Sequence, residues 1–157
     1  MEHKLIYKIK GEVELSDIPE KSTLLGKASV VNDGKELTIV SYSNMVNVVK
    51  NTLLNDELKN YSIEVIDLQT IAPIDYETIK KSVKKTKKLL VCQEAPASSS
   101  VGTTVISKIV ESDSFADLEA SPKLISGLHS PMPSAKHLEL NVIPQEEDIL
   151  NAIKSMI

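Results

Sequence analysis

Residues 63–94 carry a pattern of apolar and polar positions that predicts a strand, a helix and a second strand. An apolar run covers residues 63–68, and a polar turn that contains Pro73 follows it. A helical pattern opens after Asp75, and a second apolar run covers residues 89–92. These three elements fit within about 30 residues, the size of a βαβ crossover, in which the strands lie parallel and the helix covers one face of the sheet.

The rest of the chain continues this alternation of strands and helices. Two β-prone runs, residues 28–31 and 37–42, flank an Asn-Asp-Gly sequence that favours a hairpin, because glycine accepts a positive φ. Further helices are predicted over about 45–59 and 101–112 and after the acidic run 145–148, with a short strand at 124–125. The sequence therefore predicts an α/β fold: a three-layer αβα sandwich with a mostly parallel sheet and an antiparallel hairpin strand near the N-terminus.

Length and composition limit the classes of function. The 157 residues are most simply one domain; residues 1–22 are expected to be an extended arm or linker, and residues 23–157 the folded domain. The net charge of -4 argues against general nucleic-acid binding, which is typical of basic domains. No apolar run approaches the roughly 20 residues of a membrane-spanning helix, so no membrane partner is expected.

All the basic residues are lysine, and four of them form a dense group: Lys84, Lys85, Lys87 and Lys88. This group is either the solvated end of a helix, where cations are favoured, or a patch that docks a partner. The single cysteine, Cys92, cannot form an internal disulfide, which fits a reducing compartment. It lies in an apolar strand pattern, so we expect an inert buried thiol.

One edge of the predicted sheet is a candidate binding edge, because ligands usually meet the carboxyl ends of parallel strands. Asp67 lies near the end of one predicted strand and Glu94 ends another, while the small residues 98–102 lead into a helix that starts with Val101 and Gly102. A helix N-terminus can hold an anion, and the same edge can serve as an interface. Small residues before a helix are also ordinary loop and cap residues, so these interpretations stay open.

No residue is assigned a catalytic, cofactor-binding or metal-binding role. His3, His129 and His137 lack the spacing of metal ligands, and no G-x-S-x-G sequence surrounds the serines at 98–100. The G-x-G-x-x-G and Walker patterns are absent. The residues alone thus predict an α/β domain without a visible reaction centre.

Several motifs resemble one enzyme family by their order and spacing. Residues 63–94 resemble V-E-V-I-D-L-R-T-I-x-P-L-D-x-E-T-I-x-x-S-V-x-K-T-x-x-L-x-V-x-x-E almost step by step. Shorter similarities lie at residues 24–28, 34–42, 96, 101–102, 126–127, 131–133 and 143–144. Together these motifs are similar to the C-terminal, transketolase-like domain of the β subunit of thiamine-diphosphate-dependent 2-oxo acid dehydrogenases. Departures from the family pattern occur at Gln69, Gln93, His129 and Ser134.

The resemblance implies an assembly role. Residues 2–7 resemble the segment that follows the family's pyrimidine-binding domain, so the chain is expected to start at that domain junction. In the family, thiamine diphosphate and magnesium sit between the pyrimidine-binding domain and the α subunit, so this chain alone is expected to bind no cofactor and to be inactive. The full enzyme would decarboxylate a 2-oxo acid and transfer the acyl group to lipoyl-lysine, in the cytoplasm or in a mitochondrial or other organellar matrix.

Two positions resemble the family's acceptors for basic groups of the dihydrolipoyl acyltransferase core. Glu119 matches an acidic residue of the family's F-x-x-L-D-A-P stretch, and the carboxylate of Ile157 closes the last helix. Acidic groups at such a rim would steer a basic partner. A plain surface acid is the alternative for Glu119. The α subunit, the β subunit and a second copy of this chain are further implied partners.

Two other functions stay open. The chain could be the C-terminal domain of transketolase or deoxyxylulose-phosphate synthase, although the lack of arginine disfavours enzymes of phosphorylated sugars. It could also be a stand-alone module that binds a small anion at the helix N-terminus near Val101.

Overall fold

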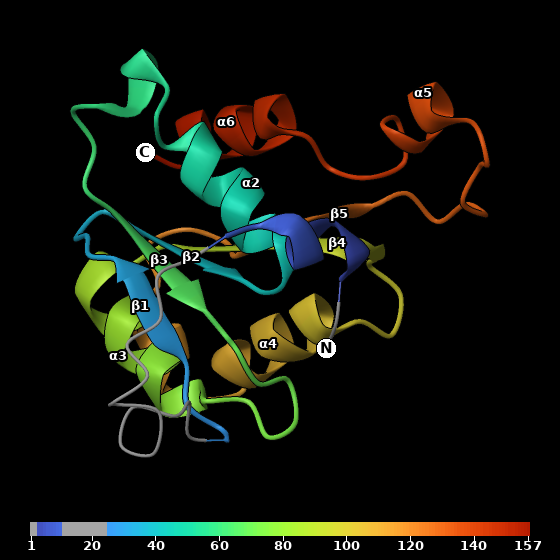
Figure 1. The fold of residues 1–157 in the computed structure, drawn as a ribbon. Coiled ribbons are helices and arrows are strands. Elements are labelled where there is room, and N and C mark those ends of the chain that lie inside the picture. The colour runs from blue at the N-terminus through green and yellow to red at the C-terminus, as the bar shows by residue number, and fades with distance from the viewer. Residues whose placement is uncertain (1–2, 11–24) are drawn as a thin grey trace, which may run out of the picture.

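The structure, a computed structural model, describes residues 3–10 and 25–157. In these residues the strands form a five-stranded sheet of order β1-β3-β2-β4-β5 (Figure 1). The strands are β1 (Ser29–Asn32), β2 (Leu37–Ser41), β3 (Ile63–Asp67), β4 (Leu89–Pro96) and β5 (Lys123–Gly127). The α-helices are α2 (Asn44–Thr52), α3 (Tyr76–Thr86), α4 (Val101–Val110), α5 (Lys136–Glu139) and α6 (Glu146–Lys154). The 3-10 helices are η1 (Lys4–Lys8), η3 (Asp56–Leu58) and η4 (Asp113–Asp117).

Helices cover both faces of the sheet (Figure 1). On one face, α2 and α6 contribute Met45, Val49 and Ile149 to a buried cluster with apolar strand residues. On the other face, α3 and α4 contribute Ile79 and Val105 to a second cluster. β1 is antiparallel to β3, and the other strand pairs are parallel. The predicted three-layer αβα sandwich with a mostly parallel sheet is therefore confirmed.

The central strand β2 shows how the apolar pattern produces these layers. All residues of β2 are buried. Ile39 belongs to the cluster under α2 and α6, whereas Val40 belongs to the cluster under α3 and α4. Successive strand residues point to opposite faces, so a strand that is covered on both sides is apolar at consecutive positions. On the neighbouring β4, Cys92 is fully buried, and burial raises the pKa of its thiol.

The predicted hairpin between residues 28–31 and 37–42 is wrong. Its first strand is antiparallel to a neighbour, as expected, but that neighbour is β3: Ser29 of β1 lies opposite Asp67. β2 lies on the other side of β3 and pairs with it in parallel. The chain between β1 and β2 therefore crosses the start of β3 instead of folding back as a tight turn.

Gly34 explains the crossing. It has no positive φ, because Gly26 alone among the described glycines adopts one. A Cβ on Gly34 would lie 2.2 Å from the carbonyl carbon of Ile63, so glycine is required for close backbone contact with β3. The next two N–H groups, of Lys35 and Glu36, donate to the carbonyl oxygen of Ser62 at 2.9 and 2.8 Å. Asn-Asp-Gly thus marks a close crossing and not a hairpin.

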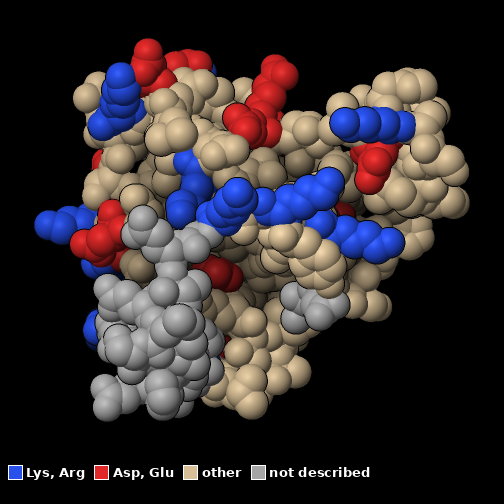
Figure 2. Space-filling model, in the orientation of Figure 1, with Lys and Arg blue, Asp and Glu red and all other residues tan. Residues whose placement is uncertain are grey.

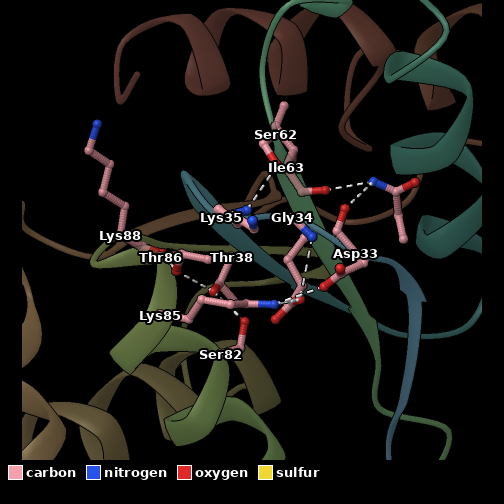
Figure 3. Close-up of polar contacts among 12 residues, drawn as sticks. Asp33, Gly34, Lys35, Thr38, Ser62, Ile63, Ser82, Lys85, Thr86 and Lys88 are labelled. Atoms are coloured by element: carbon pink, nitrogen blue, oxygen red, sulfur yellow. Dashed lines mark hydrogen bonds and ion pairs between the residues drawn. The ribbon is translucent and has the colours of Figure 1, made fainter.

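Lys85 fastens this crossing to α3 (Figure 3). Its Nζ donates to Asp33 Oδ1 at 2.8 Å and to the carboxylate of Glu64, a residue that is only 3% exposed. The hydrogen bonds to Asp33 and then Glu64 raise the pKa of Lys85. Lys87 pairs with Asp117 at 3.6 Å. Two of the four clustered lysines are therefore held by the chain's own carboxylates.

Several predicted bounds shift. The helix predicted over about 45–59 ends at Thr52, and the 3-10 helix η3 follows it as a separate turn. β4 extends to Pro96, so Glu94 lies within a strand rather than at its last position. The loop predicted over residues 128–144 contains the short helix α5. Among the described residues, every helix is too short or too polar to cross a membrane.

The N-terminal arm differs from its prediction where the structure describes it. Instead of an extended segment, residues 4–8 form η1, and the Nδ1 atom of His3 accepts a hydrogen bond from the N–H of Leu5 at 3.3 Å. The arm's residues 1–2 and 11–22 lie outside the described residues. The division of the chain at residue 22 stays a prediction.

Candidate functional site

The ends of β2, β3 and β4 form what we call the carboxyl edge of the sheet. Parallel pairing places Ser41 of β2 beside Asp67 of β3 and Cys92 of β4. From this edge α2 passes to one face of the sheet and α4 to the other (Figure 1). The gap between β2 and β4 is therefore the position at which open α/β sheets form their ligand crevice.

Glu94 lies at this crevice, and other parts of the chain bind its carboxylate. His3 Nε2 lies 2.9 Å from Oε2, and Asn44 Nδ2 donates to Oε1 at 3.3 Å. Because His3 Nδ1 accepts from Leu5, the proton of the neutral ring is on Nε2, where it is donated to Glu94. Burial, followed by the charge of Glu94, raises the pKa of Tyr42. Glu94 is thus an anchor for the N-terminal arm.

The N-terminus of α4 is bound by the chain's own side chains. The N–H of Gly102 donates to Gln93 Oε1 at 2.7 Å, and that of Thr103 donates to Ser100 Oγ at 3.2 Å. Val101 packs, partly buried, against the second core cluster. An anion would need these N–H groups, and they already donate to side chains. The N-terminus of α4 therefore does not suit a diphosphate. The role of the edge that contains Glu94, Val101 and Gly102 stays a prediction. Its geometry favours an interface over anion binding.

Asp67 does not share a site with Glu94, because β2 lies between their strands. Each strand adds about 4.8 Å of separation. Asp67 Oδ1 accepts from the N–H of Gln69 at 3.0 Å. Burial raises the pKa of Asp67, against the smaller opposing effects of the Gln69 hydrogen bond and the Lys50 charge. The carboxyl edge therefore holds two separate carboxylates and not a paired acid–base site.

Glu119 and Ile157 both lie at the opposite edge, which we call the amino edge. The N–H of Glu119 donates to the carbonyl oxygen of Lys87, just before β4 begins, at 2.9 Å. Ile157 follows α6 and packs against the first core cluster. Near it, Lys123 at the start of β5 donates to Ser155 Oγ at 2.7 Å. The fold thus brings both predicted docking positions to the end of the sheet at which β4 and β5 start.

Sequence reasoning missed the roles of three polar residues. It gave Asn44 no role at this edge and Gln93 only as a departure from a family pattern, yet Asn44 follows β2 and Gln93 lies in the last half of β4, positions near the carboxyl edge that can be predicted. His3 meets Glu94 across 91 positions of sequence, and no local pattern predicts that contact. No group of three His, Cys, Asp or Glu side chains among the described residues could hold a metal ion.

Comparison with known proteins places these features in a family. The family described as the C-terminal domain of transketolase matches residues 26–149. The chain belongs to this family. The match spans the strands β1 to β5 and the four helices α2 to α5, so the fold and the sequence agree on the family. It confirms the family indicated by the motifs of residues 63–94.

Two proteins of similar sequence are β subunits of one enzyme. The chain is 39% identical over 131 residues to the pyruvate dehydrogenase E1 component subunit beta of Rickettsia bellii, a match that covers 83% of this chain and 40% of the relative. It is 35% identical over 155 residues to the mitochondrial subunit of the same name from Pisum sativum, with 98% of this chain and 43% of the relative covered. The chain thus spans less than half the length of these relatives.

Solved structures show the same fold. A split-gene transketolase, described as an inactive beta4 tetramer, superposes with a TM-score of 0.74 over 88% of this chain and 44% of the other. A 2-oxoglutarate:ferredoxin oxidoreductase from Magnetococcus marinus has a TM-score of 0.54, over 90% of this chain and 21% of the other. At 19% and 12% sequence identity these likenesses concern the fold alone.

Proposed function

We propose that this chain is the assembly and partner-docking domain of the β subunit of a 2-oxo acid dehydrogenase. The observation that carries the proposal is the 39% identity, over most of the chain, to a pyruvate dehydrogenase β subunit. The full enzyme would decarboxylate a 2-oxo acid and transfer the acyl group to lipoyl-lysine. It would work in the cytoplasm or in a mitochondrial matrix, as the name of the Pisum sativum relative suggests.

Catalysis is assigned to other parts of that enzyme. Thiamine diphosphate supplies the carbanion chemistry when it is bound, together with magnesium. In this chain the N–H groups of Gly102 and Thr103 are engaged by side chains, and the Glu94 carboxylate is engaged by His3 and Asn44. The described residues thus offer neither a diphosphate cradle nor a free carboxylate in the crevice. Their contribution is to fold, to pair with other subunits and to hold a partner.

The amino edge supports the docking part of the proposal. Glu119 is exposed, and its neighbour in space, Lys87, is neutralised by Asp117. The carboxylate of Ile157 adds a second negative charge at the same end of the sheet. Two carboxylates at one edge suit a basic partner, because such charges steer and orient its approach. We assign this edge to the dihydrolipoyl acyltransferase core, and pairing with the α subunit, the β subunit or a second copy to other surfaces.

The first experiment combines this chain with the α subunit of the Rickettsia bellii enzyme, thiamine diphosphate, magnesium and pyruvate. We expect no release of carbon dioxide above that of the α subunit alone. The intact β subunit of the same organism, added in place of this chain, is the positive control. Turnover with this chain would contradict the assignment of catalysis to other parts of the enzyme.

The docking prediction is tested with Glu119→Lys. We expect this charge reversal to weaken binding of an acyltransferase subunit-binding domain about tenfold, which is a loss of about 1.4 kcal/mol of binding free energy. Isothermal titration calorimetry measures the affinity. Glu139→Lys is the matched control, because Glu139 is also exposed but lies on α5. Equal affinities of the two variants would remove Glu119 from the docking site.

A further inference from the structure

Residues 3–10 lie across the carboxyl edge of the sheet, and a polar contact ties one end of them to β4 (Figure 1). His3 Nε2 lies 2.9 Å from Glu94 Oε2, and the two side chains are 23% and 26% exposed. Asn44 donates to the other oxygen of the same carboxylate at 3.3 Å, which holds Glu94 in place for His3. A specific, partly buried hydrogen bond therefore joins the start of the described chain to β4.

The remainder of this segment spans a hollow and does not enter the core. No residue of η1 is buried. A hollow of about 440 Å³ lies between the segment and the domain. Ile6 and Ile9 line it from the segment, and the polar side chains of Asn47, Asp67 and Gln69 line it from the domain. Because polar side chains make up most of the lining, burial of apolar surface stabilises the position of the segment only weakly.

Such a segment opens at a lower free-energy cost than the whole domain unfolds. Local opening in native proteins involves elements with few buried apolar contacts. Lys4, Lys8 and Lys10 are exposed along the segment, and Figure 2 shows lysine side chains on the face that η1 occupies in Figure 1. Residues 3–10 are thus a surface element, and the contact of His3 with Glu94 is what ties this element to β4.

We infer that residues 3–10 are a strap that closes over the carboxyl edge, and that the contact between His3 and Glu94 holds it closed. In the closed form the Glu94 carboxylate is engaged, and the strap covers the hollow. In the open form the hollow and Glu94 are accessible at the carboxyl ends of the parallel strands, where open α/β sheets bind ligands. The strap therefore controls access to this edge. The inference is independent of the docking role of Glu119, which lies at the amino edge.

Access to the hollow is measured by the rate at which iodoacetamide labels an introduced thiol. Asn47→Cys places the thiol in the hollow, and Asn51→Cys, about one turn further along α2 and exposed, is the matched control. The native Cys92 is fully buried and should stay unlabelled. We expect Asn47→Cys to react more slowly than Asn51→Cys. Addition of His3→Ala should speed labelling of Asn47→Cys at least fivefold and that of Asn51→Cys less than twofold.

Tryptic cleavage after Lys4, Lys8 and Lys10, followed by mass spectrometry, measures opening of the strap itself. We expect His3→Ala and Glu94→Ala each to speed this cleavage at least fivefold. The double variant H3A/E94A should be cleaved no faster than the faster single variant, because both substitutions remove the same contact. His137→Ala, which removes an exposed histidine of α5, is the control and should leave the rate unchanged.

Three results would overturn the inference. The first is labelling of Asn47→Cys that is as fast as that of Asn51→Cys in the unmodified background, or that His3→Ala leaves unchanged. The second is equal cleavage of the unmodified chain and the His3→Ala variant. The third is a fall in the urea midpoint of unfolding that accounts for the faster cleavage, because the whole domain and not the strap would then be opening.

Discussion

At the scale of single residues, Asp75 joins segments that lie far apart in the sequence. Its Oδ1 accepts from the N–H of Thr78 at 3.2 Å, which caps α3, and its Oδ2 accepts from the N–H of Ala28, just before β1, at 3.1 Å. Burial acts to raise the pKa of Asp75, but the hydrogen bonds from Ala28 and Thr78 and the charge of Lys27 outweigh it, so the pKa falls below its ordinary 3.8. The ionised carboxylate is therefore the form that the fold needs.

Asp75→Ala should lower the free energy of unfolding by about 1–2 kcal/mol at pH 7, since a cap and a buried acceptor are lost together. A depressed folded-state pKa contributes stability that is present above the unfolded-state pKa and is lost as the pH falls through the folded-state value. The unmodified chain should thus lose more stability than the variant as the pH falls from about 5 to about 2. Urea unfolding at several pH values measures both effects.

Glu77→Ala is the control for Asp75, because Glu77 lies in the same helical turn and its side chain is 84% exposed. It should cost less than about 0.5 kcal/mol. Burial raises the pKa of Asp67, which gives the opposite pH dependence, but that effect is common to all three proteins. An Asp75→Ala protein with the same acid sensitivity as the unmodified chain would contradict this role.

At the scale of elements, hydroxyl groups join α3 to the central strand (Figure 3). Thr38 Oγ1 on β2 lies 2.6 Å from both Ser82 Oγ and Thr86 Oγ1 of α3. Thr86 Oγ1 in turn donates to the carbonyl oxygen of Lys88 at 3.2 Å. One consistent arrangement has Ser82 donating to Thr38, Thr38 to Thr86 and Thr86 to Lys88. Each of these three hydroxyls then has a partner, as buried polar groups require.

Thr38→Val removes the middle one of these three hydroxyls. It should lower the free energy of unfolding by about 1–3 kcal/mol, because Ser82 loses its acceptor inside the protein. The double variant T38V/S82A also lacks the Ser82 hydroxyl, which Thr38→Val leaves without a partner. Its loss of unfolding free energy should therefore be smaller than the sum of the two single losses by about 0.5–3 kcal/mol. Thermal or urea unfolding of the four proteins of this cycle measures the difference. Strictly additive losses would mean that the hydroxyls are not coupled.

The sequence predicted elements better than their pairing. Apolar periodicity predicted β2, β3, β4, α3 and α4, and the start of α3 directly after Asp75 was predicted too, because these signals are local. The hairpin failed because Asn-Asp-Gly says only that the chain turns, whereas the close contact of Gly34 with Ile63 is made with a distant strand. At the candidate site the position of Glu94 was predictable from its strand, but its partner His3 was not.

At the scale of the whole molecule, the sheet presents two edges of different character. The carboxyl edge carries the arm with Lys4, Lys8 and Lys10, and the amino edge carries the exposed Glu119. Between them helices cover both faces of the sheet. The proposed docking role uses the amino edge, and the carboxyl edge is the part of the sheet that the N-terminal residues 3–10 cover.

The most direct measurement of this account is the assembly of a chimeric β subunit. The 131-residue matching segment of the Rickettsia bellii subunit is replaced by the corresponding residues of this chain, and the chimera is expressed with the α subunit. Size-exclusion chromatography with light scattering gives the molar mass. We expect a complex of α and chimeric β subunits with the mass of the parent assembly. A folded chimera that elutes apart from the α subunit would contradict the proposed assembly role.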